Sequence, residues 1–214
     1  MVRDTILCLC DLTGVFAKPW VEAGYRAVLI DPQHGFDHDD GRVTLLARTV
    51  DEAMPFIMDL INEDRIRVVA SFPPCTDLAV SGARWFSRKY SDDHLFQAKA
   101  ISVAEQCRTV GRLSGAPWFV ENPVSVLSRV FGHPDSVFQP WWFTRWEPRD
   151  NYRKLTCLWH GGGWRQPPKN VDATLGPPDD RIHNCPPGPD RANIRSRTPR
   201  GFSIAAFHSN ESIR

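Results

Sequence analysis

The chain of 214 residues has a formal net charge of +1, and its 24% of charged residues is typical of a soluble protein. Apolar residues make up 42%, enough for a core, and no run approaches the ~18 apolar residues of a membrane span. The N-terminal apolar stretch carries Asp4 and is too short for a signal peptide, so we expect a cytoplasmic protein. The six cysteines are then expected to be reduced thiols.

Short apolar runs alternate with helical patterns over the first 131 residues. Buried strands are predicted, in chain order, at residues 5–10, 26–31, 65–72 and 117–120. Helices are predicted at residues 20–25, 55–63 and about 92–114, and residues 32–42 are expected to form a loop. This alternation predicts an α/β fold with a Rossmann-like, doubly wound parallel sheet.

Four chemically active side chains fall where the predicted strands end, namely Asp11, Asp31, Cys75 and Glu121. The carboxyl ends of parallel strands share one edge of a sheet, and ligands bind at that edge in folds of this type. The shared position of these residues is the main indication of a functional site.

Cys75 lies in the segment S-F-P-P-C-T-D, directly after a predicted strand. The two prolines pin the loop that carries the thiol. A helix beginning near residues 76–77 would lower the pKa of the thiol through its dipole and make it a nucleophile. The alternative is a buried cysteine that serves only as a small apolar residue.

Two further segments suit a ligand. Glu121, beside the apolar Trp118, could stay protonated and share its proton with a ring nitrogen, with Asn122 orienting it. Alternatively, these residues cap a helix.

The turn after the first predicted strand could also approach a ligand. Gly14 allows close backbone approach after Asp11, and Asp31 could accept hydrogen bonds from ribose hydroxyls. Here the alternative is an ordinary turn and a capping aspartate.

Residues 132–192 are rich in Pro, Gly and Trp and are predicted to be an irregular insert with a strand at 154–159. Residues 193–214 are expected to return to the core as a helix, which makes 1–214 a single domain with a catalytic core at 1–131.

The C-terminal third of the chain is basic. Residues 141–214 hold 12 Lys/Arg and 7 Asp/Glu, and this surplus of positive charge suits either a phosphate-bearing partner or only a solvated basic face. The tryptophans of this region and its neighbour could stack on bases or form a small aromatic core.

Two short Cys/His pairs in the insert raise the question of a metal. Cys157 and His160 form one pair, and His183 and Cys185 form the other. Zinc would help to order such a segment, but the spacing of the pairs is unusual. The sequence therefore predicts no metal site, with zinc as the alternative.

The motifs D-L-T-G, E-A-G-Y, P-P-C and E-N-P occur in an order and spacing that resembles the cytosine C5 methyltransferases. The similarity covers most of residues 5–131 and, more loosely, 191–208, where R-S-R-T-P-R-G-F-S-I-A-A-F is similar to the tails of short phage-type members. It implies the fold of S-adenosylmethionine-dependent methyltransferases, with methyl transfer to C5 of cytosine in DNA.

The resemblance implies roles for individual residues. Cys75 would be the nucleophile that adds to C6, Glu121 would bind N3, and Asn122 would support Glu121. Contacts to the cofactor S-adenosylmethionine would come from Asp11, Gly14, Asp31 and Pro73.

The chain also departs from the family pattern. The first turn holds one glycine, E-N-P replaces E-N-V, and the Q-x-R-x-R segment has no clear counterpart. Residues 151–154 and 193–197 are both candidates for it. We select Arg195 and Arg197, because alternate residues of a strand face the same side.

The insert at 132–192 is small for a target-recognition domain, so we expect a short recognition sequence or no sequence preference. Two alternatives stay open. One is C5 modification of a free cytosine nucleotide, and the other is a catalytically silent module that binds nucleic acid or cofactor.

Overall fold

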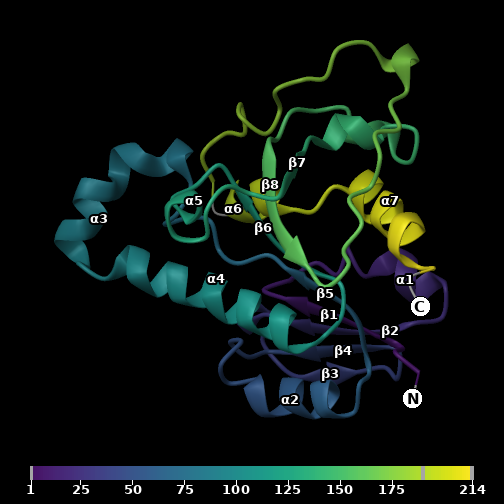
Figure 1. The fold of residues 1–214 in the computed structure, drawn as a ribbon. Helices are drawn as coiled ribbons and strands as arrows, with labels where there is room; N and C mark the ends of the chain where they lie inside the picture. The colour runs from purple at the N-terminus through teal and green to yellow at the C-terminus, as the bar shows by residue number, and fades with distance from the viewer. Residues whose placement is uncertain (1, 189–190, 213–214) are drawn as a thin grey trace.

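The computed structural model describes residues 2–188 and 191–212, which form one 8-stranded sheet with helices on both faces (Figure 1). The strand order is β3-β4-β2-β1-β5-β6-β8-β7. Five strands run parallel, namely β1 (Thr5–Leu9), β2 (Arg26–Ile30), β4 (Val43–Leu46), β5 (Ile66–Ser71) and β6 (Trp118–Pro123). The predicted α/β, Rossmann-like character is therefore compatible with the observed sheet.

Three strands complete the sheet at its edges. At one edge, β3 (His38–Asp39) pairs antiparallel with β4. At the other, β8 (Thr156–Gly161) runs antiparallel to both β6 and β7 (Ser136–Phe138). The segment 132–192, predicted to be mostly irregular, thus contributes two strands, of which β8 was expected.

Strand β1 shows why the sheet is covered on both sides. Ile6 and Cys8 face one core cluster, whereas Leu7 and Leu9 face another, as the two-residue period of a strand requires. All five residues of β1 are buried, so a continuous apolar run was needed here rather than an alternating one.

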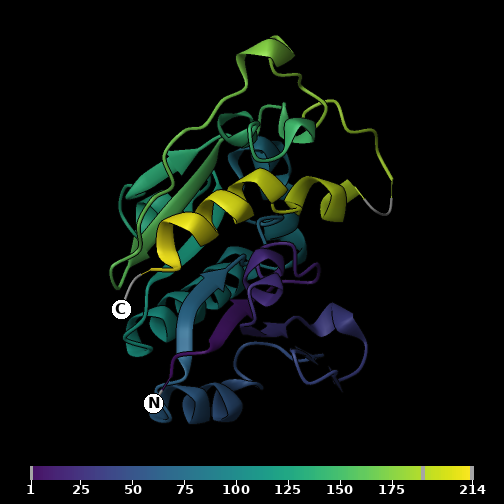
Figure 2. The same ribbon diagram turned by 90° about the vertical axis from the view of Figure 1, so that its right-hand side faces the viewer.

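Helices α1 (Lys18–Glu22) and α7 (Arg200–Asn210) cover one face (Figure 2). Helices α2 (Met54–Asn62) and α4 (Phe96–Leu113) cover the other. Helix α5 (Leu127–Val130) contributes Leu127 to a buried cluster that it shares with α4 and β8, whereas α3 (Phe86–Asp92) and α6 (Arg191–Ser196) lie outside these layers. No helix within the described residues has the length and hydrophobicity that crossing a bilayer requires.

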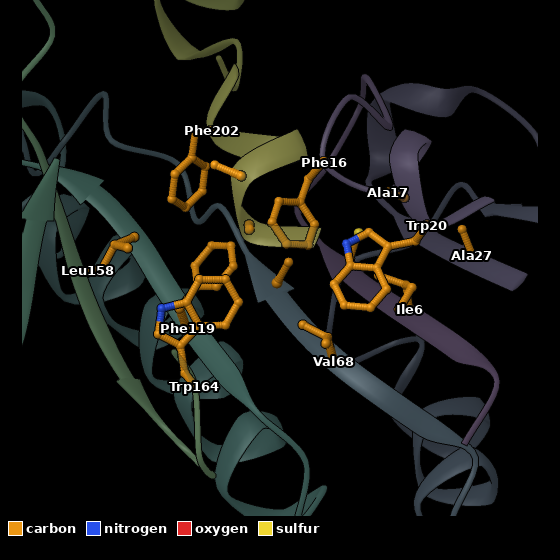
Figure 3. Packing of buried hydrophobic residues seen from close by; sticks show 14 of the residues in the cluster. Ile6, Phe16, Ala17, Trp20, Ala27, Val68, Phe119, Leu158, Trp164 and Phe202 are labelled. Atoms are coloured by element: carbon orange, nitrogen blue, oxygen red, sulfur yellow. The ribbon is translucent and has the colours of Figure 1, made fainter. Parts of the chain in front are cut away.

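The core on the α1–α7 face is largely aromatic. Phe202 of α7 is fully buried and stacks on Phe138, with ring centroids 4.1 Å apart and an interplanar angle of 2°. Figure 3 shows Phe16, Phe119 and Phe202 converging between α7 and the sheet. The predicted return of the tail to the core as a helix is confirmed.

A buried carboxylate holds the first turn of α7. Oδ2 of Asp150 accepts a 2.7 Å hydrogen bond from the backbone N of Gly201. A Cβ at position 201 would lie 2.7 Å from the carbonyl oxygen of Phe143, so only glycine allows this close approach. Burial raises the pKa of Asp150 to about 6.

Several local expectations are wrong. The segment 32–42, expected as a loop, contains a 3₁₀ turn at Pro32–His34 and strand β3, and β4 was not predicted. Strand β6 extends past residue 120, so Glu121 and Asn122 lie within it rather than after it. Their pairing with β8 continues the strand, which local propensity does not reveal.

Replacing the Phe202 ring should destabilise the fold strongly. We expect Phe202→Ala to lower the free energy of unfolding by about 3–5 kcal/mol, because it leaves a cavity among packed rings. Chemical denaturation measures this, with Val130→Ala at a half-exposed position as the control that should change stability by less than about 0.5 kcal/mol. Equal losses in the two variants would contradict the packing described here.

The Asp150 carboxyl should also make stability depend on pH. Its pKa is about 6 in the folded protein against 3.8 ordinarily, so its contribution is largest below pH 3.8 and is lost as the pH rises through 6. Asp150→Asn keeps an acceptor for the Gly201 amide but cannot ionise. We therefore expect the difference in unfolding free energy between wild type and variant to shift by about 2–3 kcal/mol between pH 3.8 and pH 7. A difference that does not vary with pH would contradict the assignment.

Candidate functional site

The sheet has a topological switch point beside its central strand. Strand β1 lies between β2 and β5, and the chain passes first to β2 on one side and later to β5 on the other. Ligands bind in such folds outside the carboxyl ends of the two diverging strands. Asp11 follows β1 and Cys75 follows β5, so the structure places both at this edge.

The proline loop that carries Cys75 is tied to both neighbouring strands. The backbone N of Phe72 donates to the Leu9 carbonyl at 2.9 Å, which continues the β1–β5 pairing to the start of the loop. Nδ2 of Asn122 donates to the Pro73 carbonyl at 3.1 Å. The Asn122 side chain is fully buried, so this bond holds the loop against β6 without competition from water.

The chain beyond Cys75 remains attached to the end of β6. The backbone N of Val80 donates to the Val124 carbonyl, and that of Val126 donates to the Leu78 carbonyl, both at 3.0 Å. Cys75 and Glu121 are therefore carried by two backbone segments that are hydrogen-bonded on both sides of the thiol. The sequence expectation that these residues come together is consistent with this arrangement.

The expected helix at residues 76–77 is wrong. Residues 76–78 form a turn, in which the Cys75 carbonyl accepts hydrogen bonds from Leu78 and Ala79, and a 3₁₀ helix begins only at Val80 (Val80–Trp85). No helix dipole therefore lowers the pKa of the thiol. Burial, followed by the Glu121 carboxylate, raises the pKa of Cys75, whereas the charges of Lys154 and Arg195 oppose the rise.

Glu121 is buried beside a lysine that sequence analysis did not select. Nζ of Lys154 lies 3.6 Å from Oε1 of Glu121, and both side chains are about nine-tenths buried. Burial raises the pKa of Glu121, and the Lys154 charge works against this. Burial is the larger of these two effects, and it acts in the direction that the sequence-based expectation of a protonated Glu121 requires.

The same lysine links the tail to the site. Its Nζ donates to the backbone carbonyls of Ser196 at 3.3 Å and Arg197 at 3.4 Å, at the end of α6. Lys154 belongs to N-Y-R-K, one of the two segments considered for the third catalytic group. The sequence therefore contained the correct segment, but no local pattern distinguished Lys154 from the arginines of residues 193–197.

The expectation of a strand at 193–197 is wrong, because α6 occupies Arg191–Ser196. Arg195 acts electrostatically on Cys75, and its Nε is buried without a hydrogen-bond partner among the described residues. The Arg197 side chain is exposed, and this residue reaches the site through its backbone carbonyl. The two arginines therefore do not face the same side.

The predicted cofactor residues form a hydrogen-bonded turn after β1. Oδ1 of Asp11 accepts from the backbone N of Thr13 at 2.8 Å and of Gly14 at 2.9 Å. Its Oδ2 is buried and has no hydrogen-bond partner within the described residues. Gly14 has φ +63°, and a Cβ there would lie 2.9 Å from Cδ2 of Leu29, which explains the glycine.

The other two predicted cofactor residues have structural contacts of their own. Oδ1 of Asp31 accepts from the backbone N of Gln33 at 2.8 Å, so Asp31 caps the 3₁₀ turn as the alternative interpretation expected. Burial and, to a smaller extent, the Asp31 charge raise the pKa of Asp11. Pro73 is buried and supplies the carbonyl that binds Asn122.

A mainly apolar cavity of about 440 Å³ opens beside Gly14, between α1 and the face of β2 and β4. It exists because the connection from β2 to β4 contains no α-helix that could cover this part of the sheet. Of the four predicted cofactor residues, Gly14 alone lines it.

The insert offers no metal centre among the residues that the structure describes. No group of three or more His, Cys, Asp or Glu side chains in this part of the chain is arranged to hold an ion. Cys157 is buried in a small core cluster, and the tryptophans at 118, 159 and 164 are also buried. Trp141, Trp142 and Trp146 remain partly accessible.

A scan against protein-family models finds no match, and a search of curated proteins finds no significant similarity to this chain. Any functional assignment therefore depends on the geometry of the site and on the resemblance of the motifs.

The two charges beside Cys75 should shift its reactivity in opposite directions. Lys154→Gln removes a positive charge, so we expect the thiol pKa to rise further and alkylation at pH 8 to slow by about threefold to tenfold. Glu121→Gln removes a negative charge and should accelerate alkylation.

Mass spectrometry of iodoacetamide-treated protein measures the alkylation of Cys75 itself, and the partly exposed Cys185 serves as an internal control. Changes of the same sign in both variants would contradict the arrangement of charges described above.

Proposed function

We propose that this protein is a methyltransferase of the S-adenosylmethionine-dependent type that modifies C5 of cytosine through a covalent adduct with Cys75. DNA is the first-choice substrate. The observation that carries the proposal is the hydrogen bond from buried Asn122 to the Pro73 carbonyl, because it brings the thiol loop and the buried Glu121 carboxyl together. That combination is the one the P-P-C and E-N-P motifs implied.

The proposed chemistry uses the site residues in sequence. The Cys75 thiol loses its proton, and the sulfur forms a bond to C6 while the C5=C6 electron pair moves to C5. Glu121 hydrogen-bonds at N3 and stabilises the resulting enamine. C5 would take the methyl group of the sulfonium donor, whose sulfur keeps the electron pair of the broken S–CH3 bond and leaves as a neutral thioether. A base then removes the C5 proton, and the C5=C6 bond re-forms as the Cys75 sulfur departs.

Burial of the Glu121 carboxyl supports this role. Burial raises the pKa of Glu121 while Lys154 acts against the rise, and the acid form would donate to N3 of the base. Lys154 and Arg195 favour the thiolate of Cys75, which burial otherwise disfavours. Lys154 is therefore a positioning residue in the proposed mechanism, since it fixes Glu121 and biases the thiol at the same time.

The turn after β1 fits the charged end of S-adenosylmethionine. Oδ2 of Asp11 is a buried acceptor without a partner among the described residues, which suits the ligand's ammonium group. Gly14 keeps the backbone approachable beside it. When bound, S-adenosylmethionine supplies an electrophilic methyl group on a sulfonium.

A catalytically silent binding module is the second candidate. The raised pKa of Cys75 and the use of Asp31 as a cap favour it, because both residues then serve the protein's own structure. Free cytosine nucleotides are the alternative substrate within the catalytic proposal, since they require no target-recognition domain.

Transfer of isotope-labelled methyl groups tests the proposal. We expect label from S-adenosylmethionine on C5 of cytosine in one of duplex DNA, single-stranded DNA, transfer RNA, dCMP or dCTP. Cys75→Ala should abolish transfer, and Glu121→Gln should lower the rate by about 10²–10⁴-fold while S-adenosylmethionine binding stays unchanged.

Cys185→Ala serves as the matched control, because this thiol lies outside the site. Transfer that survives in Cys75→Ala would exclude the covalent route. No transfer to any substrate by folded protein that binds S-adenosylmethionine would favour the binding module.

A further inference from the structure

Residues 80–95 form a surface segment with an unusual share of exposed apolar side chains. We call this segment the α3 arm, since it contains α3 and its flanking turns. Four large hydrophobic residues in it are about half exposed or more, namely Val80 (53%), Trp85 (49%), Tyr90 (56%) and Leu95 (60%). In Figure 1, α3 stands apart from the sheet, at the left of the view. Several exposed apolar side chains on one short segment are more typical of an interaction surface than of a surface with isolated apolar residues.

The charge of the α3 arm indicates the chemistry of its partner. The arm contains three basic side chains and two acidic ones, Asp92 and Asp93, and Asp93 pairs with Lys99 at 2.7 Å. Lys89 is occupied by Asp77, at 2.5 Å, and by the Thr76 carbonyl, at 3.0 Å. Arg84 and Arg88 are exposed and form no ion pair within residues 2–188 and 191–212, so they are available to anionic groups.

Aromatic and basic groups alternate on the α3 arm. The Arg84 guanidinium lies over the Trp85 ring, 5.1 Å from its centroid. A shallow hollow of about 480 Å³ adjoins Tyr90, and its lining combines aromatic rings with hydroxyl and amide groups: Phe86, Ser87, Tyr90, Ser91, Phe96 and Gln97. Rings beside arginines are the combination that binds single-stranded nucleic acid, because bases stack on the rings while phosphates pair with the cations.

The α3 arm is connected directly to the candidate site. Lys89 binds Thr76 and Asp77, the two residues after Cys75, and Nε2 of Gln97 donates to the Asp77 carbonyl at 3.3 Å. The arm and the thiol loop therefore belong to one continuous segment of the chain, and side chains of the arm and of α4 hold the two residues that follow Cys75.

We infer that the α3 arm binds a single-stranded segment of nucleic acid next to the reacting base, with Trp85 and Tyr90 stacking on bases and Arg84 and Arg88 contacting phosphates. This inference rests on the proposed function and narrows its substrate to a polymer. A free nucleotide would leave these rings and cations unused.

Binding of a fluorescein-labelled 12-nucleotide strand, followed by anisotropy, tests the inference directly. We expect Trp85→Ala with Tyr90→Ala to weaken binding at least about tenfold. Phe36→Ala removes an exposed ring outside the arm (70% exposed) and is the control, which should bind as wild type does. Arg84→Ala with Arg88→Ala should reduce the slope of log affinity against log salt by about 1.4.

Three further measurements keep this test separate from that of the proposed function. Binding of dCTP and of S-adenosylmethionine, measured by calorimetry, should be unchanged in the arm variants. Comparing the binding of a DNA strand, an RNA strand of the same sequence and a DNA duplex identifies the polymer that the arm prefers. Arm-dependent binding without methyl transfer would support the inference and contradict the catalytic proposal. Unchanged strand binding in both arm variants would overturn the inference. It would also be overturned if sedimentation showed that the arm holds two copies of the chain together and that its variants separate them without weakening strand binding.

Discussion

The candidate site depends on one buried hydrogen bond, from the Asn122 side chain to the carbonyl of Pro73. Two prolines remove backbone donors and restrict the loop, but they do not decide where the loop lies. The fully buried amide does, because leaving its donors unpaired away from water would be costly. It joins the loop after β5 to the end of β6, so the positions of thiol and carboxyl depend on each other.

Close to this bond, two opposite charges are buried side by side. Glu121 and Lys154 are both buried, and each alone would be an uncompensated charge in the protein interior. The carbonyls at the end of α6 satisfy further donors of Lys154. Three distant parts of the chain, namely Glu121, Lys154 and the end of α6, therefore meet through the ammonium group of Lys154.

The last helix makes this meeting possible. Helix α7 is held at its start by Asp150 and at its end by Arg67, which donates to the carbonyls of Asn210 and Glu211. Phe202 packs between these points. With α7 fixed at both ends, the preceding segment passes the site closely enough for Lys154 to bind it. The α3 arm, in contrast, is attached through Val80 to the end of β6 and through Lys89 to Thr76 and Asp77, and its Trp85 and Tyr90 side chains are about half exposed.

The sequence by itself determined the strands at the centre of the sheet and the side chains at their ends, because buried parallel strands are continuous apolar runs that local composition reveals. It also predicted the closing helix and the pairing of a thiol loop with an acidic strand end. Only the tertiary structure decided that Glu121 lies inside a strand, that no helix begins after Cys75, and that Lys154 lies beside Glu121. Burial and charge proximity decide these features, and both arise from residues far apart in the chain, which no local pattern records.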